Sequence, residues 1–344
     1  MTEPLLSIRG LTTRFRTDRG SLVAVDDVSF EVAAGETVAI VGESGSGKSV
    51  TALSILRLIP NPPGEIVSGQ IVFDGRDLLR LSEREMRSIR GDRIAMIFQE
   101  PMNSLNPALT VGLQVAEPVR QHRGASWAAA LDAARGLLQK VQIPDAESRL
   151  HTYPHQYSGG MRQRAMIAMA LACKPRLIIA DEPTTALDVT VQAQILDLLK
   201  ALTRETGAAL ILITHDLGVV ARYADRVVVM YAGRVVEQAH AQRLYRAPQH
   251  PYTRGLLASV PRLDGTAGAR LVPIDGSPPD LAALPAGCAF APRCASAVSA
   301  CASTRPLLRA VPLAETEHLH ACLLDTPAEA PVTVRSGTAQ EALP

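Results

Sequence analysis

One segment of the sequence combines glycine, serine and lysine in a pattern suited to binding phosphate groups. Residues Gly42–Ser49 spell GESGSGKS, which fits the pattern G-x-x-x-x-G-K-[ST] at every position. The glycines let successive backbone N–H groups point at phosphate oxygens, and the helix expected after the loop adds its positive N-terminus. We expect Lys48 to reach the β- and γ-phosphates and the Ser49 hydroxyl to bind Mg²⁺. The residues expected around the phosphates are Gly42, Ser44, Gly45, Ser46, Gly47, Lys48 and Ser49.

A second segment places two carboxylates at the end of an apolar run. Leu177–Glu182 spells LIIADE. Asp181, at the tip of the expected strand, is suited to binding Mg²⁺, and Glu182 is suited to polarising an attacking water as general base. Alone, such a pair is as typical of a helix cap or a loop. After a phosphate-binding loop, the pair predicts hydrolysis of a nucleoside triphosphate.

The elements that must position these residues alternate along the first 240 residues. Short apolar runs predict buried strands, and between them lie windows with helical periodicity. The expected strands are Thr37–Val41, Ile94–Phe98, Leu177–Ala180, Leu210–Ile213 and Val227–Met230; the expected helices are Lys48–Leu58, Trp127–Val141, Met161–Cys173 and Val191–Thr203. The alternation predicts an α/β fold with a mostly parallel sheet, the P-loop NTPase class.

The composition divides the chain further. We expect a nucleoside triphosphatase domain over residues 1–240, interrupted by an alanine-rich helical subdomain at about 106–172. Prolines accumulate after it, which predicts a separate, loop-rich C-terminal extension over residues 241–325. Residues 326–344 lack any hydrophobic pattern and are predicted to be a disordered tail.

Charge and hydropathy exclude several classes of protein. The chain of 344 residues has a formal net charge of +1, so it has no global field that would attract nucleic acid. Aromatic residues make up 3% of it, too few for base-stacking platforms. The apolar runs are far shorter than the roughly 20 residues of a membrane-spanning helix. We expect an intracellular protein without a targeting segment.

A third segment, Ser158-Gly159-Gly160 at the start of an expected helix, could form a second anion site. Tyr157–Arg164 (YSGGMRQR) resembles the signature motif of ATP-binding cassette (ABC) ATPases, with Met161 where glutamine is usual. A serine N-cap on an ordinary helix is the simpler alternative. The resemblance implies an ABC-type nucleotide-binding domain in which this motif contacts the ATP of the facing subunit, so that two chains enclose ATP between them.

The same resemblance assigns further residues. It implies that Gln99 contacts Mg²⁺ and water and senses the membrane partner, that Asp188 lies in a loop facing the other subunit, and that His215 contacts the γ-phosphate. Phe15 matches an aromatic position that lies against adenine, although a phenylalanine in an early strand is as often a core residue. The catalytic set implied is Glu182, His215 and Gln99, with Ser49, Gln99 and Asp181 around Mg²⁺.

Four segments resemble the oligopeptide/dipeptide-importer branch of this family, and the likeness extends over residues 5–325. They are Met96–Pro107 (MIFQEPMNSLNP), Tyr153–Ser158 (YPHQYS), Asp181–Gln194 (DEPTTALDVTVQAQ) and His250–Leu257 (HPYTRGLL). The branch implies a second, non-identical ATPase subunit, two transmembrane permease subunits, indirect contact with an extracytoplasmic substrate-binding protein, and a peripheral location on the cytoplasmic face of the cell membrane.

Other functions remain open on the sequence. Importers of nickel and other small solutes share much of this pattern, and the ATPase sequence does not identify the cargo. A soluble ABC ATPase acting on DNA or ribosomes is disfavoured, because the chain has one P-loop, no heptad run and almost no net charge. An iron–sulfur sensor with secondary ATPase activity is disfavoured by the intact catalytic set.

The cysteines are unevenly distributed. Cys288, Cys294, Cys301 and Cys322 lie near the C-terminus, whereas Cys173 is alone in an apolar stretch and is expected in the core. Without a C-x2-C pair, the spacing suits an iron–sulfur cluster better than zinc. The equivalent cysteines of some relatives imply a [4Fe-4S] cluster. Zinc, with His318 or His320 replacing a thiolate, and four free buried thiols are the alternatives.

Overall fold

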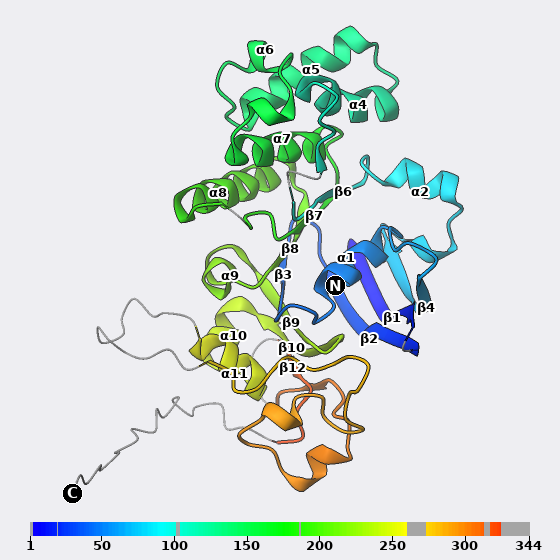
Figure 1. Cartoon of the computed structure of the whole chain (residues 1–344), viewed down its shortest axis with the longest axis vertical. Coiled ribbons are helices and arrows are strands. Elements are labelled where there is room, and N and C mark those ends of the chain that lie inside the picture. The colour runs from blue at the N-terminus through cyan, green and yellow to red at the C-terminus, as the bar shows by residue number, and fades with distance from the viewer. Residues whose placement is uncertain are drawn as a thin grey trace, which may run out of the picture.

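The computed structural model describes residues 3–18, 20–100, 104–185, 187–259, 273–312 and 317–324 (Figure 1). The predicted disordered tail, residues 326–344, lies outside these ranges. Among the described residues, none of the helices has the length and hydropathy needed to cross a membrane.

An eight-stranded sheet forms the centre of the molecule. Its order is β11-β12-β10-β9-β3-β8-β7-β6, and the five strands from β9 to β6 are parallel. These strands are continuous apolar runs with helices on both faces, as the sequence predicts. Their bounds are Thr37–Val41 (β3), Ile94–Ile97 (β6), Leu177–Asp181 (β7), Ala209–Thr214 (β8) and Arg226–Tyr231 (β9). The antiparallel edge consists of Arg234–His240 (β10), Arg309–Ala310 (β11) and His318–His320 (β12).

A second, antiparallel sheet of order β2-β1-β4-β5 lies beside α1 (Figure 1). It comprises Leu6–Thr17 (β1), Gly20–Val32 (β2), Gly64–Phe73 (β4) and Arg76–Asp77 (β5). For this part of the chain, the sequence predicts only an early strand around Phe15. In β2 the last residues alternate between buried and exposed, with Val28 and Phe30 facing the core, the pattern of a sheet with one solvated face.

Helices surround the parallel strands and form the predicted helical region. Those around the sheet are Lys48–Ile55 (α1), Glu83–Ile89 (α2), Val189–Thr206 (α8) and Leu217–Tyr223 (α9). Those of the helical region are Val111–Arg123 (α4), Trp127–Lys140 (α5), Ala146–Arg149 (α6) and Gly159–Leu171 (α7). One hydrophobic core joins the region to the sheet, since Val115 and Leu138 share it with Ile178. Cys173 is buried there, as predicted.

The extension contains more regular structure than predicted. It begins with Ala241–Arg246 (α10) and Pro251–Ala258 (α11), and later includes the 3-10 turns Ala291–Arg293 (η3) and Ser299–Ala302 (η4). Its strand β12 pairs with β10, so the extension completes one edge of the central sheet. Tyr252 and Phe290 of the extension share a core with Val41 and Tyr231 of the sheet. The extension is therefore packed onto the fold of residues 1–240, whereas the sequence suggested a separate region.

Candidate functional site

The phosphate-binding loop lies between β3 and α1, as its motif predicts. Gly42 has φ 154° and Gly47 has φ 99°, a region that side chains rarely adopt. A Cβ on Gly42 would lie 2.2 Å from the carbonyl oxygen of Met230, and one on Gly47 would lie 2.5 Å from that of Ala24. Both positions therefore require glycine for conformation and for space. The two ends of the phosphate loop thus lie close against the backbone at Met230 and Ala24.

Lys48 lies folded over this loop. Its ammonium donates hydrogen bonds to the carbonyl oxygens of Gly42, at 2.8 Å, and Glu43, at 2.9 Å. Burial lowers the pKa of Lys48, and the negative charges of Glu182 and Asp181 oppose that effect. The loop thus contains a buried cation where the motif places phosphate groups.

Ser49 and Asp181 meet between α1 and β7. The Ser49 hydroxyl donates to the Asp181 carboxylate at 3.0 Å. Burial raises the pKa of Asp181, while the hydrogen bond from Ser49 opposes the rise. A buried carboxylate gains stability from a cation, and a carboxylate beside a hydroxyl is a donor set that suits Mg²⁺ completed by phosphate oxygens and water. These residues fit the expected metal.

Glu182 is the centre of a second group of polar side chains. Gln99 donates to its carboxylate at 3.0 Å, and Nδ1 of His215 lies 3.4 Å from its other oxygen. Thr185 also donates to it, at 2.9 Å. Glu182 itself has φ 45°, an uncommon conformation for a non-glycine residue that is typical of functional sites. Three strand ends and the loop after β7 therefore converge on one carboxylate.

The sequence analysis did not single out Thr185. It lies in the quoted DEPTTALD segment, three residues after Glu182. A threonine at that distance can hydrogen-bond back to a preceding side chain, and this local spacing is the signal that could have identified it.

The signature residues form a separate group at the N-termini of α7 and α8. Ser158 caps α7 by accepting a hydrogen bond from the N–H of Met161, and Asp188 caps α8 in the same way. A Cβ on Gly160 would lie 3.0 Å from Cγ1 of Val191. The structure thus places Ser158, Gly159 and Gly160 next to the loop that contains Asp188. Within this chain, Ser158 and Asp188 each cap a helix. For Ser158, a helix cap is the simpler alternative that the sequence allows.

Phe15 lies in β1, on the antiparallel sheet. It pairs with Leu22 of β2 and Gly64 of β4, and a Cβ on Gly64 would lie 2.8 Å from its ring. The Phe15 ring therefore packs over Gly64, near the end of β1, and is half-buried. An adenine-stacking function for Phe15 stays a prediction.

The four C-terminal cysteines converge although they are far apart in sequence. Cys288, Cys294, Cys301 and Cys322 line one small cavity and form no disulfide. Burial raises the pKa of Cys288, Cys294 and Cys322, and the neighbouring thiols contribute to the rise. Across the described ranges, no set of three or more His, Cys, Asp or Glu side chains forms a group that could hold a single metal ion.

Comparison with known families agrees with this geometry. The family model described as ABC transporter matches residues 25–185. The model described as oligopeptide/dipeptide transporter, C-terminal region, matches residues 236–301. The first match contains the phosphate loop and the Asp181–Glu182 pair, and the second contains most of β10, all of α11 and three of the four clustered cysteines.

Individual relatives extend the match over most of the chain. The dipeptide transport ATP-binding protein DppD of Bacillus subtilis (strain 168) is 55% identical over 304 residues, which are 88% of this chain and 90% of the relative. The oligopeptide transport ATP-binding protein OppD of Salmonella typhimurium (strain LT2) is 51% identical over 303 residues, with the same two coverages.

Among solved structures, the ATP-binding cassette MJ0796, in a dimeric post-hydrolysis state bound to ADP and Pi, superimposes with a TM-score of 0.62. It is 31% identical, and the match covers 69% of this chain and 98% of the cassette. The chain therefore belongs to the ATP-binding proteins of ABC transporters, in the branch that has the oligopeptide/dipeptide transporter C-terminal region.

Proposed function

We propose that this chain hydrolyses ATP to drive the import of peptides through a membrane transporter. The observation that supports it best is the convergence of Lys48, the Ser49–Asp181 pair and Glu182 at the carboxyl ends of neighbouring parallel strands. In open α/β sheets this edge is where ligands bind. The branch to which the chain belongs supplies the link to peptides.

In the proposed site, the backbone N–H groups of the loop and the Lys48 ammonium bind the phosphates of ATP. The loop residues involved are Gly42, Ser44, Gly45, Ser46, Gly47, Lys48 and Ser49. Ser49, Asp181 and Gln99 hold Mg²⁺, which neutralises phosphate charge when it is bound. Phe15 contacts the adenine ring.

Glu182 acts as the general base. Its carboxylate accepts a proton from the water that attacks the γ-phosphorus, the bond to the β-phosphate oxygen breaks, and ADP and phosphate are the products. Lys48 and His215 stabilise the negative charge on the transferred group. Gln99 and Thr185 orient the Glu182 carboxylate through the hydrogen bonds described above.

A second ATPase subunit completes the site. Ser158, Gly159 and Gly160, together with Asp188, contact ATP held by the facing subunit, which is related but not identical. Val189, next to Asp188, is 81% exposed, and an apolar side chain at that exposure is suited to an interface. The matched cassette MJ0796 is itself described as dimeric.

Two transmembrane permeases are the other direct partners, which gives the chain a peripheral location at the cytoplasmic face of the membrane. An extracytoplasmic substrate-binding protein delivers cargo to them. Phe98, Leu109 and Tyr153 are large apolar or aromatic side chains exposed in and near the helical region. They support docking of the permeases close to Gln99, where closure of the ATP site is transmitted.

The experiment that tests the cargo is an ATPase assay on the transporter complex purified with its permeases and binding protein. Added di- or oligopeptides are expected to raise the rate of phosphate release, and added Ni²⁺ is expected to have no effect. Stimulation by Ni²⁺ alone would instead identify a nickel importer. Phosphate release that no peptide raises in the assembled transporter would contradict a peptide cargo.

We also propose that the cysteine cavity holds a [4Fe-4S] cluster, with zinc as the alternative. In such a cluster each thiolate binds a different iron, so the sulfurs need not converge on one ion. The shared cavity and the absence of disulfides among the cysteines support this. When bound, the cluster cross-links irregular segments that have little core of their own. Iron, sulfide and zinc analysis of anaerobically purified protein tests it: zinc without iron would overturn the cluster.

A further inference from the structure

One residue of the phosphate loop, Glu43, is held by the C-terminal extension. Its backbone N–H donates to the hydroxyl of Tyr252 at 2.8 Å. Its carboxylate accepts two hydrogen bonds from Arg293, at 2.6 and 3.0 Å. Both partners lie beyond residue 240, in α11 and η3. The extension therefore grips the main chain and the side chain of the same loop residue.

Both gripping groups are buried. Tyr252 is fully buried, and the Arg293 side chain is 6% exposed. Burial raises the pKa of Tyr252, so the phenol stays neutral, and its oxygen accepts the N–H of Glu43. A paired, bidentate arginine–carboxylate contact is among the strongest and most directional in proteins. Losing Tyr252 would remove the partner of the Glu43 N–H, and losing Arg293 would leave the Glu43 side chain, which is 25% exposed, without its paired cation.

The two groups are themselves rigidly placed. Tyr231, Tyr252 and Phe290 pack in one aromatic cluster, with ring centroids 4.6 to 5.4 Å apart. Arg293 lies against this cluster and donates a further hydrogen bond to the carbonyl oxygen of Asp275 at 2.9 Å. Because packing already holds these side chains in one conformation, their contacts with the phosphate loop can hold the loop in position.

Glu43 transmits this constraint to the phosphate site. Its carbonyl oxygen accepts a hydrogen bond from Lys48, so one residue links the extension to the cation of the proposed phosphate site. Later in the loop, a Cβ at Gly45 would meet open space. The loop is thus restrained at Glu43 and open at Gly45. Phosphate binding by backbone N–H groups requires the loop to keep one conformation.

We propose that Tyr252 and Arg293 are positioning residues for the phosphate loop, through which the C-terminal extension sets the affinity of the site for ATP. The inference rests on the proposed nucleotide binding at this loop. It assigns the extension a function in ATP binding that is distinct from any metal it holds.

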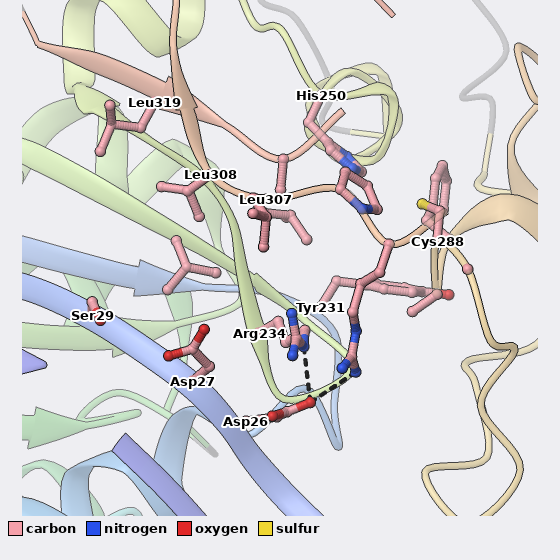
Figure 2. A pocket seen from close by; sticks show the side chains of 18 residues that line it. Asp26, Asp27, Ser29, Tyr231, Arg234, His250, Cys288, Leu307, Leu308 and Leu319 are labelled. Carbon is pink, nitrogen blue, oxygen red and sulfur yellow. Dashed lines mark hydrogen bonds and ion pairs between the residues drawn. The ribbon is translucent and has the colours of Figure 1, made fainter. Parts of the chain in front are cut away.

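A matched control exists on the same interface. Arg305 of the extension pairs with Asp26 of β2 at 2.8 Å, and Asp26 also pairs with Arg234 at 2.9 Å (Figure 2). These residues border a cavity of about 220 Å³ between β2 and the extension. Arg305 thus joins the same two parts of the molecule as Arg293, but it does not contact the loop in any interaction described here.

The test compares Tyr252→Phe, Arg293→Lys, Arg293→Ala and Arg305→Ala in the full chain within its transporter complex. We measure the Kd for Mg·ATP, the KM and kcat of phosphate release, and the melting temperature. For Tyr252→Phe and Arg293→Ala, Kd and KM are expected to rise about 3- to 10-fold with little change in kcat. Arg293→Lys is expected to recover part of the affinity, and Arg305→Ala is expected to match the wild type.

Several outcomes would overturn the inference. One is an unchanged Kd in Tyr252→Phe and Arg293→Ala variants that remain folded. Another is an equal loss of affinity in Arg305→Ala, since that would reflect general loosening of the interface. The wild-type chain separates this inference from the proposed function: if it does not bind Mg·ATP, the proposed function itself has failed.

Discussion

The molecule contains two clusters of reactive side chains, and they are built in opposite ways. Around the phosphate loop, Lys48, Asp181 and Glu182 follow the ends of parallel strands and combine positive and negative charge. In the extension, four thiols of one chemical type meet on irregular backbone. The aligned ends of parallel strands can position side chains of unlike charge on their own. Thiols on loops are held in place by what they bind or by the fold around them.

The two regions are linked through Arg293, which lies in the extension but contacts the phosphate loop. Arg293 directly precedes Cys294 of the thiol cavity, yet its side chain binds Glu43 of the phosphate loop. The less regular region therefore restrains the site that carries out the chemistry. Four changes should affect the two regions differently.

The largest effect is expected from Lys48→Ala. Removing the buried ammonium takes away the cation at the phosphates, so turnover is expected to fall about 100-fold or more. Phosphate release by the complex measures it. Lys200→Ala is the matched control, because Lys200 donates to Thr37 at the opposite end of β3. Comparable losses in both variants would contradict a specific contribution from Lys48.

Cys301→Ser should damage the other region and spare the chemistry. We expect loss of bound iron and a lower melting temperature, because three thiolates hold a cluster less well than four. The kcat at saturating ATP is expected to stay near the wild-type value. Cys173→Ser, outside the cavity, is the control and should keep its iron. An iron content unchanged by Cys301→Ser would show that this thiol is not a ligand.

Acid is expected to destabilise the extension first. Burial lowers the pKa of His250 from 6.5 to about 4. Burial alone would raise the pKa of Glu237, but its hydrogen bonds, foremost from His318, hold it below the usual value. Unfolding lets His250 take up a proton below pH 6.5 and Glu237 below about 4.5. Stability therefore falls as the pH drops from 6.5 through 4.5.

Thermal unfolding of the full chain at pH 7, 6 and 5 measures this effect. His250 accepts a hydrogen bond from the N–H of Tyr252 at the start of α11, and asparagine can replace that cap without titrating. His250→Asn is expected to reduce the change in melting temperature between pH 6.5 and 5. A wild-type melting temperature that does not change over this range would contradict the assignment.

The smallest effect is expected from Thr185→Val. The variant removes one hydrogen bond to the Glu182 carboxylate while keeping the shape of the side chain. Since Gln99 still orients the base, kcat is expected to fall only about 3- to 10-fold. Thr185→Ser should restore most of the rate. A valine variant with wild-type kcat would show that this contact does not influence the base.

Much of the site was predictable because local patterns determine it. The loop motif predicted Lys48 and Ser49, the apolar run before Asp181 and Glu182 predicted the strand that presents them, and the family resemblance supplied Gln99. The antiparallel sheet was missed, because the half-exposed alternation in β2 is a weaker signal than a buried run. Strand β12 was missed as well, since three residues form no detectable pattern.

The contacts between the extension and the loop had no sequence signal. Arg293 and Glu43 are separated by 250 residues, and each alone is an ordinary surface residue type. Their pairing depends on α11 and η3 packing against the sheet through Tyr252 and Phe290. Only tertiary structure could show it. The convergence of the thiols was predictable as a possibility from their number, but not as a shared cavity.

The central claim is that this fold hydrolyses ATP with Glu182 as the base. Its most direct test is phosphate release by Glu182→Gln in the assembled transporter, measured together with the ATP that remains bound. Release is expected to fall about 100-fold or more while ATP stays bound, because the amide keeps the shape of the carboxylate but cannot accept the proton. Phosphate release at the wild-type rate would contradict it.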